Sequence, residues 1–564
     1  MSLNASLLIG KSAITASQAA MQVAGNNMAN AATPGFSRQV TSLSPSAPER
    51  IGRNQFVGTG VQLQSIHRAV DTALQARLRS AISDEQGTLV DQRFLQSVET
   101  LQNELTDNDL STLLGAFFNS FSELANNPLD SAVRNVVVQQ GATLAARVQD
   151  MHDGYDTIRR EIDSSLEASV AKANGLVDQI AELNVRIAQT EQGQSEAGSL
   201  RDQRDRLVEE LSGLIDVSVI EQPGGAIDVL VGSLPVVLGS QSRGLELRTR
   251  TVGDALEVSV RVAADGSQLT VRSGSIGALL RQRTDTVAPA LERLDDFAAQ
   301  LILQVNNLHA QGQGLKGHQS ISGTNSVPDT ATALNATAND LPWPVKNGAF
   351  TIHVTHEGSG SRTSFVVPVD GNVDSLDDLV DRINNVVGVS QVTASIGLDN
   401  TLSLAADPGY SITFSDDSSG VLAALGVNGF FAGRGAGDIE VWAPLLDDPA
   451  LVAAGLDHVP GSNENALAIV ALQDVAVDAL GGRTLGEHWQ AGVNELAVRG
   501  DAAGNAAESA RLVRESIAAQ HQAVSGVSLD EEAVNLLAFQ RQFQAAARFV
   551  AAIDEVMQTL LSIA

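Results

Sequence analysis

Two short motifs in this sequence contain residues that could bind phosphate or a dinucleotide, but neither has the context that such chemistry needs. The segment Ala5–Ser12 ends in Gly-Lys-Ser, as a phosphate-binding loop does, yet it lacks the first glycine and follows no strand. Gly312–Gly317 fits the spacing G-x-G-x-x-G, but it follows a helical pattern and opens a polar stretch. We therefore expect no nucleotide site at either motif, and we interpret the second as a flexible linker.

A metal site is the other chemistry that the sequence suggests, at His353, His356 and Glu357. Side chains at positions i and i+3 of a strand point to opposite faces, so the two histidines cannot converge on one ion. We expect a surface or hairpin-edge role for them. The acidic pairs at 377–378 and 416–417 lack the ligand spacing of a calcium loop. We predict no enzyme activity, no cofactor and no metal site.

Composition excludes further classes of function. A chain of 564 residues has room for roughly three or four domains. Its net charge of −30 argues against nucleic acid, whose phosphates need a cationic surface. It has no cysteine, so disulfides and thiolate metal sites are excluded. Its most apolar stretch, residues 467–480, is interrupted by polar residues, so we predict no membrane insertion and no cleaved signal peptide.

Both ends of the chain carry apolar residues at heptad spacing, which is typical of helices that pack against other helices. The C-terminal pattern has one row of residues at sevens and a second row between them: Leu536, Phe543, Val550 and Met557, with Phe539, Ala546, Ile553 and Leu560. The N-terminal pattern has large residues in one row and mostly small ones in the other: Leu7, Ile14, Met21 and Met28, with Leu3, Gly10, Ser17 and Ala24. The small row would let another helix approach closely.

The N-terminal helix is expected to end in the turn Asn26–Arg38. Pro34 disfavours helix in the residue before it, and Gly35 permits positive φ. Residues 1–70 carry a net charge of +4, whereas residues 525–564 carry −3. This difference favours pairing of the two ends.

The two ends resemble the axial proteins of the bacterial flagellum, the family of rod, hook and hook-associated proteins. The turn Asn26–Arg38, which contains Asn27, Asn30, Gly35 and Phe36, resembles that family's N-terminal signature. The segment Ser525–Glu532 resembles its C-terminal one. Within the family, Ser37-Arg38-Gln39 and Asp530-Glu531-Glu532 point to the first of the two junction proteins between hook and filament. Two internal stretches, Asp202–Val208 and Leu422–Phe431, agree with this interpretation.

Between the ends, the period of the apolar residues changes along the chain, which predicts an α+β multidomain fold with terminal coiled-coil segments, a domain of long helices forming a rod, and inserted antiparallel β and mixed domains facing outward. The longest helix is predicted over residues 131–192, about 90 Å of helix. The predicted parts are a terminal coiled-coil assembly domain at 1–70 with 525–564, a helical rod domain at 71–214, 276–310 and 455–524, a β domain at 215–275, a linker at 311–345, and a mixed α/β domain at 346–433.

The resemblance implies a structural protein that forms the junction between hook and filament. Its expected partners are further copies of itself in a ring or helical layer, the hook protein, the second junction protein, and a cytoplasmic export chaperone that binds the C-terminal helix. Its expected place is outside the cell, after export by the flagellar type III system. The alternatives are a hook or distal-rod protein, or a secreted coiled-coil adhesin or scaffold, which the heptads alone would permit.

Overall fold

The structure is a computed structural model, and it describes residues 3–50, 56–103, 108–192, 195–252, 255–388, 391–456 and 459–563. The chain divides into two compact units. Unit 1 contains Met1–Phe94, Glu161–Thr284 and Asp501–Ala564, and unit 2 contains Leu95–Arg160 and Asp285–Gly500. The chain therefore begins and ends in unit 1. The residues of the predicted rod domain fall in both units.

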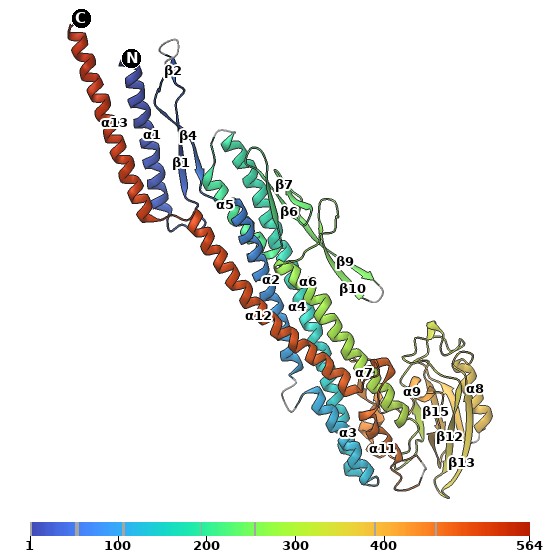
Figure 1. Ribbon diagram of the computed structural model, residues 1–564. Coiled ribbons are helices and arrows are strands. Elements are labelled where there is room, and N and C mark those ends of the chain that lie inside the picture. The colour runs from blue at the N-terminus through green and yellow to red at the C-terminus, as the bar shows by residue number, and fades with distance from the viewer. Residues whose placement is uncertain are drawn as a thin grey trace. The chain divides into compact units, whose positions relative to one another are not determined.

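In unit 1, the first and last helices of the chain lie side by side, and a β-hairpin packs against the first (Figure 1). These elements are α1 (Leu3–Asn30), α13 (Leu529–Ile563) and the hairpin strands β1 (Gln39–Pro45) and β4 (Val61–Arg68), with the short pair β2 (Glu49–Arg50) and β3 (Phe56–Val57). The predicted pairing of the two ends is confirmed within a single chain.

Three long helices run through the boundary between the units, and two shorter ones lie in unit 1. They are α2 (Thr72–Gln102), α4 (Ser131–Glu191) and α12 (Leu485–Ser525), with α5 (Gly198–Leu214) and α6 (Gly274–Arg281). The predicted 60-residue helix is confirmed as α4. Its apolar residues recur every three or four positions, so they form one continuous buried face. The apolar pattern over residues 71–105 predicts α2, and the end of that pattern at Leu105 lies outside the described residues.

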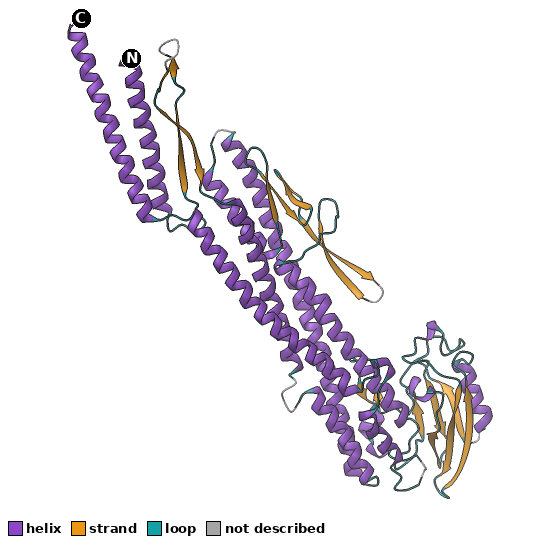
Figure 2. Cartoon of the chain, in the orientation of Figure 1, coloured by secondary structure: helices purple, strands orange, loops and turns teal. Residues whose placement is uncertain are grey.

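The strands of unit 1 between α5 and α6 form two antiparallel groups (Figure 2). One is the sheet of β5 (Ser218–Glu221), β6 (Ile227–Val231), β7 (Leu234–Leu238) and β8 (Gln241–Ser242), and the other is the ribbon of β9 (Leu245–Val252) and β10 (Ala255–Val262). Alternating apolar residues favour this structure, because every second side chain can be buried. The β structure predicted at 215–275 is confirmed.

Unit 2 has an aromatic core made by residues that are far apart in sequence. The rings of Phe117, Phe121 and Phe430 lie within 5.2–5.6 Å of one another, and Phe431 packs beside them. The helical elements of this unit are α3 (Leu110–Asn126), η1 (Gln282–Val287, shared with unit 1), α7 (Ala288–His309), α9 (Val421–Ala424), α10 (Ala443–Asp447), η3 (Pro449–Leu451), α11 (Glu464–Ala471), η4 (Leu472–Asp474) and η5 (Asp478–Leu480).

The mixed part of unit 2 contains two three-stranded antiparallel sheets and one helix. The sheets have the orders β13-β12-β16 and β11-β15-β14, beside the short pair β17-β18. The elements are β11 (Ser320–Ser322), η2 (Thr337–Asn339), β12 (Gly348–His356), β13 (Ser361–Val369), α8 (Leu376–Val387), β14 (Val392–Ile396), β15 (Leu402–Ala406), β16 (Tyr410–Ser415), β17 (Phe431–Ala432) and β18 (Glu440–Val441). Ser375 and Asp378, whose N-cap and N3 spacing in the sequence predicts a helix start, form a reciprocal capping box at α8.

The interpretation of residues 311–345 as a flexible linker was wrong. Val327, Leu334 and Val345 are buried, and β11 pairs with β15, so this segment is part of the mixed domain. Its glycines are needed for packing: a Cβ on Gly314 would overlap the carbonyl oxygen of Ala450. Composition alone suggested a linker because small polar residues are common both in linkers and in tightly packed loops.

The C-terminal part of the predicted rod domain, residues 455–524, is not one continuous helix in the structure. It contains α11, two short turns and then α12. Gly481 and Gly482 have φ values of 68° and 74°, which no residue of a right-handed helix adopts. This pair of glycines separates the two helices.

Candidate assembly interface

The small residues of α1 allow it to lie close to α13. Gly10, Ser17 and Ala24 are all buried. A Cβ on Gly10 would overlap Val550 Cγ2 and lie 3.3 Å from Phe549 Cδ1. The predicted close approach along this row is therefore confirmed, and at Gly10 it leaves no room for a side chain.

The large heptad residues at the two ends are only partly covered by this pairing. On α13, Ile553 and Ala546 are buried and Leu560 is exposed. The other large seam residues are half-buried, and they are Leu536, Phe539, Phe543, Val550 and Met557 on α13 and Leu7, Ile14, Met21 and Met28 on α1. A pair of helices leaves such residues partly in contact with water, whereas a larger bundle would cover them.

An apolar groove lies along the open side of this helix pair. Leu7, Leu8, Ile14 and Val550 line it, with the polar side chains of Asn4 and Lys11 beside them, and its volume is about 490 Å³. Leu8 is exposed, so the groove opens to solvent. Two of the residues predicted for the N-terminal interface, Leu7 and Ile14, therefore lie in one concave apolar surface.

A second apolar stripe on α13 lies next to the predicted seam, and its first residue, Phe549, also reaches α1 beside Gly10. The heptad pattern predicted Leu560 but not Phe549 and Val556. Phe549, Val556 and Leu560 are 44%, 50% and 51% exposed, and the small Ala552 lies between the first two along the helix. Phe549 and Val556 are seven residues apart, each one position before a seam residue, so the signal was present in the sequence. The heptad repeat was assigned to the seam residues Val550 and Met557 alone, so the same repeat at Phe549 and Val556 was not recognised.

Near the end of the pair, three polar side chains join the two termini. Asn27 Nδ2 donates to Glu532 Oε2 at 3.2 Å and to Gln39 O at 2.9 Å, and its Oδ1 accepts from Gln39 N. Arg38 Nε donates to Glu532 Oε1 at 2.8 Å. Asn27 and Glu532 are buried, so this contact fixes the start of α13 against the end of α1. The charge difference between the ends predicted a pairing, but Glu532 was not predicted as a site residue.

The signature turn that follows α1 has a geometry that requires its proline and glycine. Phe36 N donates to Thr33 O at 3.2 Å, and Gly35 has φ of 73°. Proline at the second position and glycine at the third are typical of a type II turn. A Cβ on Gly35 would also overlap the side chain of Arg206 on α5. Asn30 stabilises the preceding turn by donating to Asn26 O at 3.0 Å.

An ionic cluster under this turn connects it to α5. Ser37 N donates to Asp202 Oδ2, and Arg68 Nη1 lies 2.9 Å from Asp202 Oδ1 and 2.7 Å from Asp205 Oδ2. Burial alone would lower the pKa of Arg68, but the carboxylates of Asp205, Asp202 and Glu196 outweigh it and raise the pKa. The terminal signature and the internal stretch Asp202–Val208, both quoted for the resemblance, therefore meet in space.

A polar cavity of about 480 Å³ lies between the signature turn, α5 and the end of α12. Burial, together with the charge of Asp205, raises the pKa of Glu209 in its wall to about 6. Burial lowers the pKa of His521 on the opposite wall. Within the described residues, no group of three or more His, Cys, Asp or Glu side chains is placed to hold a metal ion.

The internal stretch Leu422–Phe431 has a structural role in unit 2. Asn428, which has φ of 54°, donates from Nδ2 to Ala310 O at 3.0 Å and accepts at Oδ1 from His318 Nε2 at 2.9 Å. The buried ring of His309 donates from Nδ1 to Asn428 O and accepts at Nε2 from Ala453 N. A ring that accepts a hydrogen bond at Nε2 must be neutral. Burial agrees with this, because it lowers the pKa of His309 to about 4.

Two of the motifs considered for catalysis lie inside regular secondary structure, one in a helix and one in a strand. Ala5–Ser12 lies inside α1, so it forms no phosphate-binding loop. His353 is buried in the middle strand β12 between the hydroxyl groups of Ser364 and Ser415, so its predicted surface or hairpin-edge role is wrong. Strand β12 pairs with β13 on one edge and with β16 on the other, so His353 lies in the middle of a sheet. The short apolar pattern of this strand in the sequence does not show that both edges are paired. Among the described residues, no helix combines the length and the apolarity needed to cross a membrane.

Two family models match this chain. Residues 95–323 match the helical domain of the flagellar hook-associated protein FlgK. Residues 518–563, which cover the end of α12 and all of α13, match the C-terminal segment of the flagellar basal body rod proteins FlgEFG.

Curated relatives align with less than half of the chain. Flagellar hook-associated protein 1 of Bacillus subtilis strain 168 is 33% identical over 224 residues, which are 38% of this chain and 43% of that protein. The protein of the same name from Escherichia coli K12 is 28% identical over 237 residues, which are 42% of this chain and 43% of that protein. The chain thus spans under half the length of the curated relatives it matches.

A solved structure has the same fold over most of the chain. The flagellar hook junction protein FlgK from Burkholderia pseudomallei gives a TM-score of 0.50 at 18% identity, covering 80% of this chain and 100% of that one. This likeness concerns the fold alone, and it confirms the predicted α+β multidomain class.

Proposed function

We propose that this chain, a relative of flagellar hook-associated protein 1, is a structural subunit of the bacterial flagellum that forms the junction between hook and filament. The observation that carries the proposal is the pair of unfilled apolar surfaces at the termini, the groove on α1 and α13 and the second stripe on α13. Soluble monomers rarely expose neighbouring apolar surfaces of this kind without a partner for them.

In this proposal the stripe of one subunit lies in the groove of the next. Because two different surfaces meet, the contact is heterologous and repeats into a ring or a helical layer. Covering Phe549, Val556 and Leu560, each about half exposed, would stabilise the contact by about 1 kcal/mol per side chain. Lys11 beside the groove and Asp554 and Glu555 beside Val556 have opposite charges, which favours this orientation.

A layer of this kind has two open ends, which is what a junction needs. We propose that one end binds the hook protein and the other binds the second hook-associated junction protein. Before assembly, a cytoplasmic export chaperone would cover the C-terminal helix, whose exposed apolar residues otherwise favour aggregation. The assembled protein would lie outside the cell, after export by the flagellar type III system, and its role would be structural and not catalytic.

A hook or distal-rod protein is the main alternative. The match of residues 518–563 to the rod proteins is compatible with it, because that segment contains the helix that we propose for assembly. The match of residues 95–323 to the hook-associated helical domain favours the junction. A secreted adhesin or scaffold would also use heptads, but neither family match favours it.

The test of the interface is Val556→Asp in the chromosomal gene, with Gln544→Asp as the matched control. Both residues are exposed on α13, and Gln544 lies outside the stripe. We expect Val556→Asp to leave the α1–α13 pair and the fold of unit 2 intact and to abolish filament attachment, with flagellin released into the medium. The control should swim normally. Normal filaments on the Val556→Asp strain would contradict the proposed interface.

A further inference from the structure

A small pocket in unit 2 is lined by a buried arginine, Arg134, and by exposed apolar side chains. The turn between α3 and α4, the segment that follows α7 and the described part of the loop before α11 form its walls, and its volume is about 170 Å³. Leu129 comes from the turn, Leu315 from the second segment, and Val459 and Ser462 from the loop. Arg134 lies in the first turn of α4. All the lining residues that the structure describes belong to unit 2.

Arg134 is a buried cation that pairs with no carboxylate of the described residues. It is 2% exposed. Its Nη1 donates to Val452 O and its Nη2 donates to Pro128 O at 2.6 Å, so both acceptors are uncharged backbone groups. Its Nε is buried and has no hydrogen-bond partner. A guanidinium has five N–H groups, so these two bonds to described residues leave three of them unused.

The surroundings of Arg134 therefore favour an anion. A buried charge loses its hydration, and an opposite charge with good hydrogen bonds is what compensates for this loss. Burial lowers the pKa of Arg134 to about 10, whereas a carboxylate in contact would raise it. Arg68 in unit 1 shows the contrast, because it is also buried but pairs with three carboxylates, those of Glu196, Asp202 and Asp205.

Other charged side chains near the pocket already have partners. Ser462 Oγ donates to Glu464 Oε2, and Lys316 Nζ pairs with Asp448. Among the described residues that line the pocket, Arg134 is the one charged residue. An anion that enters the pocket therefore meets a positive charge in its wall.

The rim of the pocket is apolar. Leu129, Leu315 and Val459 are exposed, and they come from three separate segments of the chain. Single exposed apolar residues are normal, but three around one pocket form a surface that an apolar group can cover. An inorganic anion would pair with Arg134 and leave this rim exposed, whereas an uncharged apolar molecule would cover the rim and leave Arg134 unpaired. A carboxylate on a short hydrocarbon chain fits both features.

Hydrogen bonds within unit 2 hold the walls of the pocket in place. Gln313 N donates to Gly455 O at 2.7 Å, and Leu315 N donates to Ala450 O at 2.8 Å. A Cβ on Gly455 would overlap Ser462 Oγ, so the loop lies close to itself at this point. The pocket is therefore formed without a ligand, which lowers the entropy cost of binding.

We propose that this pocket binds a small organic carboxylate. The carboxylate group pairs with the unused N–H groups of Arg134, and the hydrocarbon chain lies against Leu129, Leu315 and Val459. Such a ligand stabilises unit 2, because it binds the folded state and not the unfolded one. This inference goes beyond the proposed function, since it concerns a ligand of unit 2 and does not require assembly.

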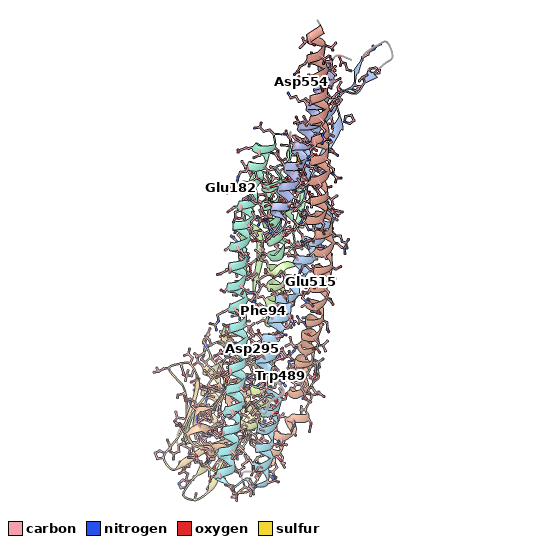
Figure 3. The ribbon with its side chains drawn as sticks, turned by 90° about the vertical axis from the view of Figure 1, so that its left-hand side faces the viewer. Phe94, Glu182, Asp295, Trp489, Glu515 and Asp554 are labelled. Atoms are coloured by element: carbon pink, nitrogen blue, oxygen red, sulfur yellow. The ribbon has the colours of Figure 1, made fainter. Side chains whose placement is uncertain are left out.

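The test is urea unfolding of the purified full chain at neutral pH, with sodium butyrate as the probe. Fluorescence reports on unit 2, because the three tryptophans of the chain lie there; one of them, Trp489 on α12, is labelled in Figure 3. We expect the urea midpoint to rise with butyrate until it saturates. At ten times the dissociation constant, the ratio of folded to unfolded protein should rise about elevenfold.

Three other additives separate the two parts of the ligand. Sodium acetate keeps the carboxylate and shortens the chain, so we expect it to bind more weakly than butyrate. 1-Butanol keeps the chain without the charge, and sodium chloride supplies an inorganic anion at equal ionic strength. Neither should give a saturable rise of the midpoint. A rise with chloride or butanol equal to that with butyrate would overturn the proposal, and so would the absence of a saturable butyrate effect.

Two variants test the residues named. Arg134→Gln should abolish the effect of butyrate, and a folded Arg134→Gln protein that still binds it would contradict the proposal. Leu129→Ser changes an exposed side chain, so it also tests the site where Arg134→Gln does not fold. It should weaken butyrate binding about fivefold, through the apolar area no longer covered, and leave acetate binding nearly unchanged.

The matched control is Leu398→Ser, which changes another exposed leucine of unit 2 outside the pocket. It should bind butyrate as the wild type does. Equal butyrate binding by Leu129→Ser and Leu398→Ser would show that the rim is not part of the site and would overturn the proposal. All these measurements use monomers, so failure of assembly would not affect them.

Discussion

At the scale of single residues, the charge of Glu532 depends on partners from the opposite end of the chain. This carboxylate is 3% exposed and is bonded by Arg38 and Asn27. A buried charge is stable only when such partners compensate for lost hydration. Glu531, one residue away, also reaches Arg38 at 3.2 Å but is largely exposed, and exposed ion pairs contribute little. The two adjacent glutamates thus contribute differently to stability, because Glu532 is buried and Glu531 is exposed.

We predict that Glu532→Gln loosens the signature turn and that Glu531→Gln does not. Loss of the buried charge leaves Arg38 without its main partner, at a cost of about 1–3 kcal/mol. The measurement is the rate of trypsin cleavage after Arg38 in the folded protein. Faster cleavage is expected in Glu532→Gln alone, and equal rates in the two variants would show that the contact does not hold the turn.

The buried ring of His309 makes the stability of unit 2 depend on pH. Its folded-state pKa of about 4 lies below the ordinary value of 6.5, so the unfolded chain binds a proton at a higher pH than the folded one. Stability is therefore fully present above pH 6.5 and is lost as the pH falls from 6.5 to 4, by about 3 kcal/mol in all. Burial lowers the pKa of His318 too, which acts in the same direction.

Tryptophan fluorescence can follow this unfolding without interference from unit 1, because Trp343, Trp442 and Trp489 all lie in unit 2. We expect the urea midpoint to fall between pH 6.5 and pH 4, and to fall less in His309→Gln, which cannot take up the proton. The control is His152→Gln, a histidine outside the core. A midpoint independent of pH in the wild type would contradict the assignment of a neutral buried ring.

At the scale of elements, the terminal helices show how much a heptad pattern predicts and what it leaves out. The repeat predicted both helices and the small row on α1, because such a periodicity has few other physical explanations. It did not predict the second stripe at Phe549 and Val556, because that stripe follows the same repeat one position earlier. The role of Glu532 was also missed, because its partner Arg38 is 494 residues away in sequence.

The errors inside the chain have a different cause. Residues 311–345 have the composition of a linker, and only the contacts made by Val327 and Leu334 identify them as part of a domain. The break before α12 was present in the sequence as Gly481-Gly482 and was overlooked in favour of the apolar residues around it. Local composition therefore predicted type and order of most elements, and failed where tertiary contacts override it.

We predict that Gly10→Val separates α1 from α13, whereas Gly25→Ala does not. The added side chain at position 10 would overlap Val550, while a Cβ at position 25 meets nothing within 4 Å. Amide exchange along α13 is the measurement: faster exchange over residues 536–557 is expected for the first variant only. An α13 that stays protected in Gly10→Val would mean that the helix is stable without α1.

At the scale of the whole molecule, the chain begins and ends in unit 1, and both ends contribute to the apolar groove proposed for assembly. The middle of the chain forms the mixed domain of unit 2 and the β region of unit 1, which lie far from the termini in sequence. The two family matches cover residues 95–323 and residues 518–563 separately.

The central claim is that this protein joins hook to filament, and electron microscopy of cells that lack it, with an assay for flagellin in the medium, tests this most directly. The account predicts complete hooks without filaments, together with released flagellin, and restoration of filaments by the wild-type gene. Basal bodies without hooks would make the chain a rod or hook protein. Intact filaments on the deletion strain would contradict the junction role.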